Sequence, residues 1–287
     1  MKIKMSRGER LFTVFNYFLL TALMLVCVYP LWHVVMASFS DPHALISHSG
    51  LILRPIKFST MAYERVFSNK LLWKSFLNTF KLLGISLTFQ MVMTTVGAYF
   101  LSRPNLMLRR PLMLLITFTM FFSGGMIPTY LNLRDLGLTN SIWGLVLPSS
   151  ISTYNLIVLR TSFESVPISL QEAAKIDGAG DFTILTQIIL PLSKATLAVI
   201  ALYYGVMVWN SWFWACIILK DRTQYPLQAI LREVLIENVM EGMDSGMPSP
   251  ETIRYATIVV ATLPILCIYP FIQKYFTKGV MIGAVKE

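Results

Sequence analysis

Six stretches of this sequence consist mostly of apolar residues, and each is long enough to cross a lipid bilayer as a helix of about 20 residues. They lie at 11–36, 76–102, 112–131, 141–160, 192–219 and 254–276. Of the 287 residues, 55% are hydrophobic and only 14% are charged, whereas about 25% of the residues of a soluble domain are charged. A soluble fold of this length could not bury so much apolar surface. The sequence therefore predicts an all-α membrane protein with six transmembrane helices in one domain, 1–287.

Two of these stretches contain residues that interrupt a helix. The third holds Ser123-Gly124-Gly125 followed by Pro128, which predicts a break near one membrane face. The fourth is interrupted by Pro148-Ser149-Ser150 and contains Asn155. Buried helices tolerate such residues when neighbouring groups satisfy the freed backbone.

The distribution of lysine and arginine predicts the orientation, because basic residues favour the cytoplasmic side of short loops. With the N-terminus inside, thirteen basic residues fall in inside segments and ten in outside segments. The short loop 103–111 alone carries three arginines and no acid, whereas 220–252 carries six acidic residues. Both termini are therefore predicted to be cytoplasmic, with 37–73 and 220–252 outside. Within the latter, apolar residues at helical spacing predict an amphipathic helix from Pro226 to Val239.

The polar segment between the fourth and fifth stretches, 161–191, is predicted to form two helices rather than a plain linker. Ser169 and Glu172 have the spacing of a capping box, which starts a helix. Gly178 can end this helix in the left-handed conformation.

The second helix of this segment is predicted to start with Asp181 as its cap and to end where Pro191 breaks the chain. Its apolar side chains are expected to face one side; they are Phe182, Ile184, Leu185, Ile188 and Ile189. In the first helix, Ala173 and Ala174 form a small surface, and Glu172 beside them offers a carboxylate to a basic partner. From the residues alone, docking on a cytosolic protein and resting on lipid headgroups explain the segment equally well.

The spacing of this segment resembles a known motif. Glu172-Ala173-Ala174, Gly178 and Ile188-Ile189-Leu190-Pro191 match the EAA motif of the permease subunits of bacterial ABC importers. Other stretches are similar to the carbohydrate-uptake branch of that family, among them Tyr29-Pro30, Trp209-Asn210 and Tyr225-Pro226-Leu227. Ser123-Gly124-Gly125 and the tail Gly279-Val280-Met281-Ile282-Gly283 resemble a sub-branch for oligo- and polysaccharides that includes an alginate importer.

This resemblance implies how the chain works. The segment 161–191 would be the coupling loop that inserts into a cleft on an ATP-hydrolysing subunit, where Glu172 pairs with a basic group. Ala173, Ala174 and Gly178 would allow close packing, and Ile188, Leu190 and Pro191 would join the loop rigidly to the fifth span. The tail from Lys278 would reach between the ATPase subunits, although it ends in Lys286-Glu287 where many relatives end in Lys-Gly.

The resemblance also implies partners and a location. A second homologous permease, two ATPase subunits and an extracytoplasmic solute-binding protein would assemble with this chain in the cytoplasmic (inner) membrane of a bacterium. The chain contains no Walker A sequence, so it is expected to be no enzyme and to hold no cofactor, with ATP and Mg²⁺ on the partner ATPase. The three cysteines and three histidines lack metal-ligand spacing. The net charge of +9 is attributed to basic loops at the membrane face, not to nucleic-acid binding.

Aromatic and amide side chains on the fifth span are candidates for the substrate path, because such groups often hold sugars. The candidates are Tyr203, Tyr204, Trp209, Asn210 and Trp212. The alternative is that the aromatic residues anchor the span at the membrane interface.

The sequence bears on three alternative functions. A permease of the same family for a non-sugar solute fits the same motifs. An ion-coupled secondary transporter is disfavoured because the span interiors hold almost no charged residues; Lys81, near a span end, is the main exception. A membrane-embedded enzyme is disfavoured because no HExxH or GxSxG motif occurs.

Overall fold

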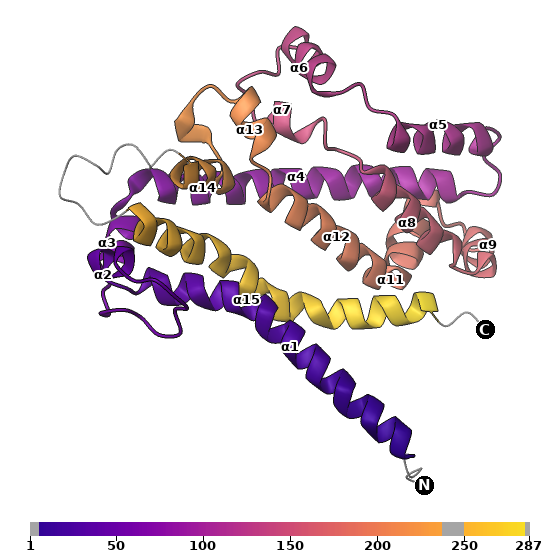
Figure 1. Cartoon of the computed structure of the whole chain (residues 1–287). Helices are drawn as coiled ribbons and strands as arrows, with labels where there is room; N and C mark the ends of the chain where they lie inside the picture. The colour runs from indigo at the N-terminus through magenta and orange to yellow at the C-terminus, as the bar shows by residue number, and fades with distance from the viewer. Residues whose placement is uncertain (1–5, 237–249, 285–287) are drawn as a thin grey trace. The chain divides into compact units, whose positions relative to one another are not determined.

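The computed structural model describes the backbone of residues 6–236 and 250–284, and the side chains of 6–235 and 251–268. Over these residues the chain is helical, apart from one isolated antiparallel bridge between Ser40 and Phe58. It forms two compact units, Met1–Lys70 with Glu233–Pro264 and Leu71–Arg232 with Ile265–Glu287. Figure 1 labels the helices. Parts of two expected features, the outer segment 220–252 (237–249) and the C-terminal tail (from 285), lie outside the described residues.

The first unit is built on the long helix α1 (Arg7–Ser38), which starts at a capping box between Ser6 and Glu9. Two short helices follow, α2 (Pro42–Ile46) and α3 (Met61–Ser68). Ala37, Leu45 and Ile52 form a small core, against which Tyr255 of α15 (Pro250–Ala284) packs. Most of α1 leaves its apolar side chains exposed, since only Ala37 and Ser38 are buried.

Aromatic packing orders the segment that follows α1. The ring of Phe39 lies 5.7 Å from the ring of Phe58 and 4.6 Å from that of Tyr63. The Tyr63 hydroxyl shares a 2.8 Å hydrogen bond with the Ser38 hydroxyl. The part of the expected outer segment 37–73 up to α3 is therefore a folded cap on the end of α1.

The second unit contains the remaining elements, apart from Lys70 and Glu233–Ile236, which belong to the first unit. In chain order they are α4 (Lys70–Ser102), α5 (Arg109–Phe121), α6 (Met126–Asp135), α7 (Trp143–Val146), α8 (Thr153–Glu164), α9 (Ile168–Ile176), α10 (Asp181–Ile184), the π-helix η1 (Leu185–Ile189), α11 (Leu190–Leu192), α12 (Lys194–Trp209), α13 (Phe213–Ile218), the 3₁₀-helix η2 (Arg222–Gln224) and α14 (Leu227–Ile236). Helix α14 lies within the predicted amphipathic helix, and its Leu227, Ala229 and Ile230 are buried.

Three helices are long and apolar enough to cross a membrane: α1, α4 and residues Glu251–Ile268 of α15. Two bent pairs also qualify if each is one span: α5 with α6, bent by 113°, and Asp181–Leu192 with α12, bent by 85°. The first bend confirms the break predicted at Ser123-Gly124-Gly125, where Gly125 has φ +86°. The fourth predicted span, 141–160, is divided into α7 and α8. The described chain thus has three to five candidate spans, and the count of six stays a prediction.

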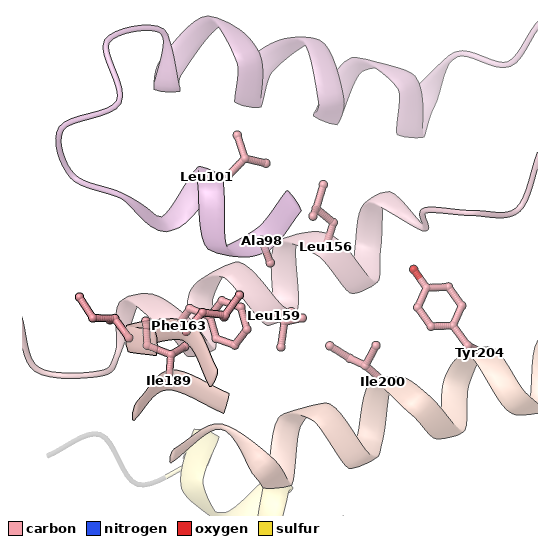
Figure 2. Close-up of a cluster of buried hydrophobic side chains, with 10 residues drawn as sticks. Ala98, Leu101, Leu156, Leu159, Phe163, Ile189, Ile200 and Tyr204 are labelled. Carbon is pink, nitrogen blue, oxygen red and sulfur yellow. The ribbon is translucent and has the colours of Figure 1, made fainter. Parts of the chain in front are cut away.

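The core of the second unit surrounds α8. Leu156, Leu159 and Phe163 of this helix pack against side chains of α4, η1 and α12. Figure 2 shows α8 between the end of α4 and α12, with Ile200 and Tyr204 of α12 directed toward it. Because η1 also belongs to this core, the segment 161–191 is packed onto the helices and is not a free loop.

Candidate functional site

The first helix of the loop 161–191 begins earlier than predicted. Helix α9 starts at Ile168 with Pro167 as its N-cap, and no side chain caps it. The predicted capping box of Ser169 and Glu172 is therefore wrong. Pro167 has φ −53° and ψ 129°, and its carbonyl accepts from the Leu170 N–H at 3.3 Å, so the backbone closes the first turn without a side-chain cap.

The turn after α9 forms as predicted. Gly178 has φ +81°, a conformation that disfavours other residues. The Gly178 N–H donates to the Lys175 carbonyl at 3.1 Å, and the Ala179 N–H donates to the Ala174 carbonyl at 2.9 Å. A Cβ on Gly178 would meet no atom within 4 Å. Glycine is thus required here by backbone conformation, not by crowding against this chain.

The second helix differs from the prediction in two ways. Its N-cap is Gly180, and Asp181 is its first residue. The chain then winds as a π-helix over Leu185–Ile189 before turning into α12 after Pro191. The wider π turn changes which residues share a face.

The predicted single apolar face is therefore wrong. Ile184, Leu185 and Ile189 are buried and Ile188 is half-buried, but Phe182 is 78% exposed.

Both helices of the loop are attached to the end of α4. The Arg103 guanidinium lies 4.1 Å above the Tyr99 ring and donates a hydrogen bond to Oε1 of Gln171 on α9. The Tyr99 hydroxyl donates to the Asp181 carbonyl at 3.1 Å. Lys175 and Asp181 form an ion pair of 3.7 Å across the turn. Contacts within the chain therefore hold the two helices in a defined orientation.

A second arginine cluster holds the start of the loop. Glu164, at the end of α8, pairs with Arg109 of α5 and with Arg160, the latter at 2.7 Å. The Arg160 Nε also donates to the Leu101 carbonyl at 3.2 Å. The planar guanidinium can make several such bonds at once. Sequence reasoning used these arginines only for orientation, because nothing local pairs Arg103 with Gln171.

The loop leaves a mixed surface exposed. Glu172, Ala173 and Gly178 are exposed, whereas Ala174 is half-buried and packs against the core. Ile176 is 87% exposed, like Phe182 on the other side of the turn. Sequence reasoning missed these two exposed apolar residues, although two large apolar residues beside a polar turn are a usable signal. Of the residues expected to join the loop to the fifth span, Leu190 and Ile188 are half-buried and Pro191 is exposed.

The path candidates of the fifth span do not form one surface. Tyr204 is fully buried; its hydroxyl lies 2.6 Å from Oγ1 of Thr94 and accepts from the Ser152 N–H at 2.9 Å. In this conformation Tyr204 joins α12 to α4 and to the α7–α8 break. Tyr203 lies one residue away, with its ring 6.3 Å from that of Tyr154.

The other three candidates gather where α12 ends. Trp209 is buried with its ring 5.7 Å from the Phe80 ring. Asn210 is exposed, and its amide donates to the Val206 carbonyl at 2.9 Å. The Arg232 guanidinium lies 4.2 Å above the Trp212 ring. In the part of the chain whose side chains are described, no three histidine, cysteine, aspartate or glutamate residues could hold a metal ion.

Long apolar helices and broken candidate spans are the features of an integral membrane protein. Residues 82–282 match the family described as binding-protein-dependent transport system inner membrane component. The chain belongs to this family and is a permease subunit of an ABC importer, as the motif had indicated.

Three comparisons describe its likeness to known proteins. A polygalacturonan/rhamnogalacturonan transport system permease protein of Bacillus subtilis (strain 168) is 44% identical over 97% of this chain and 99% of its own length. A chain of a bacterial ABC transporter involved in the import of the acidic polysaccharide alginate is 34% identical, with TM-score 0.90, over 96% of this chain and 100% of that one. A second alginate transporter structure, in complex with a pentasaccharide-bound periplasmic protein, shares the fold at TM-score 0.60 and 17% identity, over 92% of this chain and 93% of that one.

Proposed function

We propose that this permease subunit carries an acidic oligo- or polysaccharide across the cytoplasmic membrane of a bacterium. The support comes from two relatives over nearly their full length, one named for polygalacturonan and one for the acidic polysaccharide alginate. A non-sugar solute remains the alternative, and uptake assays with acidic and neutral glycans decide between the two.

The proposed topology has six spans, with both termini and the coupling loop in the cytoplasm. In this topology the arginines at the end of α4 and the start of α5 lie on the inner side, as the positive-inside rule requires. The proposed assembly contains a second permease, two ATPase subunits that bind ATP and Mg²⁺, and an extracytoplasmic binding protein. This chain itself performs no catalysis.

The exposed surface of the clamped coupling loop is the observation that carries the proposed coupling role. Glu172 and Ala173 lie on α9, while Ile176 and Phe182 flank the turn at Gly178. Exposed apolar side chains on a rigid, polar support are typical of a protein–protein contact. A loop resting on headgroups would not need both of its helices attached to α4. The proposed contact places Ile176 and Phe182 in an apolar cleft of the ATPase, with Glu172 beside a basic group.

For the substrate path, we propose Tyr203, Trp209, Asn210 and Trp212 at and near the end of α12, with Tyr204 as the buried support behind them. A change of conformation during transport would be needed to expose Trp209.

The test of coupling uses the whole importer with Glu172→Lys, Phe182→Ala and Gly178→Val. All three are expected to reduce co-purification of the ATPase and ATP-driven uptake at least about tenfold, since interface anchors are worth about 2 kcal/mol or more. Glu64→Lys on α3 is the control for an added positive charge, because Glu64 lies outside the loop. Normal ATPase binding and uptake in all three loop variants would disprove the docking role.

A further inference from the structure

Lys81 is a charged residue that the coupling mechanism does not use. It lies in α4, a candidate span with lysines at 70, 74 and 81 and no acidic residue. Ionisable residues inside spans are costly and commonly mark the path of a substrate. Among the residues with described side chains, Lys81 forms no ion pair. Its ammonium group is therefore available to an anion.

Lys81 lines a cavity of about 140 Å³ in the second unit. The other walls include Asn78 of α4, Ile142 before α7, and Leu219 and Gln224 before α14. Complete ligand pockets have volumes of about 300–1,000 Å³. The cavity is thus large enough for one charged substituent of a ligand and too small for an oligosaccharide.

Hydrogen bonds to α4 hold the far wall of this cavity. The Asn78 amide donates to the Thr223 carbonyl at 2.8 Å and to the Tyr225 carbonyl at 3.1 Å. The Leu227 N–H donates to Oγ1 of Thr79 at 2.7 Å. Hydrogen bonds within the chain therefore hold this wall in place. Both amide hydrogens of Asn78 are used in hydrogen bonds to this wall. Lys81 is therefore the strong hydrogen-bond donor that remains available to a ligand in the cavity.

Asp221, the acidic residue on the same wall segment, already has partners. Its carboxylate accepts from the Thr223 N–H and hydroxyl, both at 2.8 Å. These bonds hold the pKa of the Asp221 carboxyl below its ordinary value, helped by Gln224 and by the charge of Lys74. Asp221 thus offsets the charge of Lys74, which lies two helical turns before Lys81 on α4, and among the described residues no acidic side chain pairs with Lys81.

The cavity that Lys81 lines adjoins the apolar side chains at the end of α12. Phe80, the neighbour of Lys81 in the chain, is 48% exposed and contacts Trp209 edge to face. Leu82 and Ile142 of the cavity walls belong to the same apolar cluster as Val208 of α12. The cavity therefore adjoins the end of α12, where path residues are proposed.

We propose that Lys81 binds the carboxylate of an acidic sugar unit as the glycan passes the end of α12. The assignment rests on the proposed function and deepens it, since it names the group that distinguishes acidic from neutral glycans. Lys81 is exposed, and a charge-assisted hydrogen bond is about twice as strong as a neutral one, so it can select for charge.

The test measures uptake by the complete importer in proteoliposomes, with oligogalacturonate and its methyl ester of equal length as probes. Lys81→Met is expected to reduce uptake of the acid at least about tenfold, because hydrogen bonds to charged groups contribute about 1.5–3 kcal/mol. Uptake of the ester should stay within about twofold of wild type. Lys81→Arg should retain most acid uptake, and Lys74→Met is the matched control. Uptake by each variant is compared with uptake by wild type for the same probe. The binding protein is the same in both measurements, so its preference for one probe does not affect the ratio.

The other possible results of this experiment each contradict a specific part of the proposal. Equal loss of both probes in Lys81→Met would make Lys81 a structural residue, and unchanged acid uptake would show that it is not needed; either result overturns this inference alone. Wild-type uptake of neutral glycans but not of acidic ones would overturn the acidic substrate and this inference together. If wild type transports no glycan, the proposed function itself fails.

Discussion

Helices α1 and α4 are nearly equal in length, 32 and 33 residues, and similarly apolar. They nevertheless bury different kinds of side chain. Helix α1 buries Ala37 and Ser38 at its end and exposes leucine, phenylalanine and valine along its length. Helix α4 buries eleven residues, and six of them are polar: Ser75, Thr79, Ser86, Gln90, Thr94 and Ser102.

This difference follows from the solvent. Lipid accepts a leucine as readily as a protein core does, so apolar side chains gain little by leaving the membrane. Polar and small side chains gain hydrogen bonds and close packing when helices meet. On α4, the Gln90 amide donates to the Ser149 carbonyl at 3.0 Å, which supports the broken backbone between α7 and α8. In this chain, buried polar residues therefore identify the packed face of a helix better than hydrophobicity does.

The largest expected effect comes from matched leucines. Leu101→Ala on α4 should lower the free energy of unfolding by about 3 kcal/mol, because a cavity forms in the packed core. Leu25→Ala on α1, where the side chain is 60% exposed, should change it by less than about 0.5 kcal/mol. Thermal unfolding in detergent micelles measures both. Equal losses of unfolding free energy in the two variants would mean that α1 is packed as tightly as α4, and the proposed difference between the two helices would be wrong.

Matched tyrosines should give a smaller effect. Tyr204→Phe removes a buried hydroxyl that bonds Thr94 and the Ser152 N–H, and should cost about 2 kcal/mol since a backbone donor loses its partner. Tyr17→Phe on α1, an exposed position, should be neutral. The same unfolding assay applies, with hydrogen exchange at the α7–α8 break as a local reporter. Unchanged exchange in Tyr204→Phe would show that the break does not depend on this hydroxyl.

Matched threonines should give the smallest difference. Thr79→Val keeps the shape but removes the acceptor for the Leu227 N–H, and should cost about 1 kcal/mol. Thr21→Val on the exposed part of α1 should be neutral or slightly favourable in lipid. Limited proteolysis between residues 219 and 227, with unfolding as a second readout, measures the release of this segment. If both variants behave alike, the Thr79 hydrogen bond contributes nothing measurable.

Local signals in the sequence predicted several features correctly. Ser123-Gly124-Gly125 marked the bend between α5 and α6, because glycine adopts backbone conformations that other residues avoid. Gly178 marked the end of α9 for the same reason. The spacing of the EAA motif identified the family, which the comparisons confirm. Each of these features depends on residues close together in the chain.

Other features could not be derived from neighbours in the sequence. The π-helix at Leu185–Ile189 depends on how this segment packs on α8, so the predicted apolar face was wrong. The contact of Arg103 with Gln171 joins residues 68 positions apart. The pattern of apolar residues in the fifth span also did not distinguish Tyr204, which is buried, from Tyr203, which is partly exposed.

The sequence by itself determined that the chain is helical, that it lies in a membrane, and that the loop 161–191 has the motif of an ATPase-coupling segment. These properties follow from composition, apolar length and short-range spacing. Only the tertiary structure decided that the loop is clamped to α4 through Arg103 and Tyr99, leaving Ile176 and Phe182 exposed. The reason is physical: in lipid, helices pair through individual hydrogen bonds and close packing between distant residues, and a one-dimensional pattern does not record those pairs.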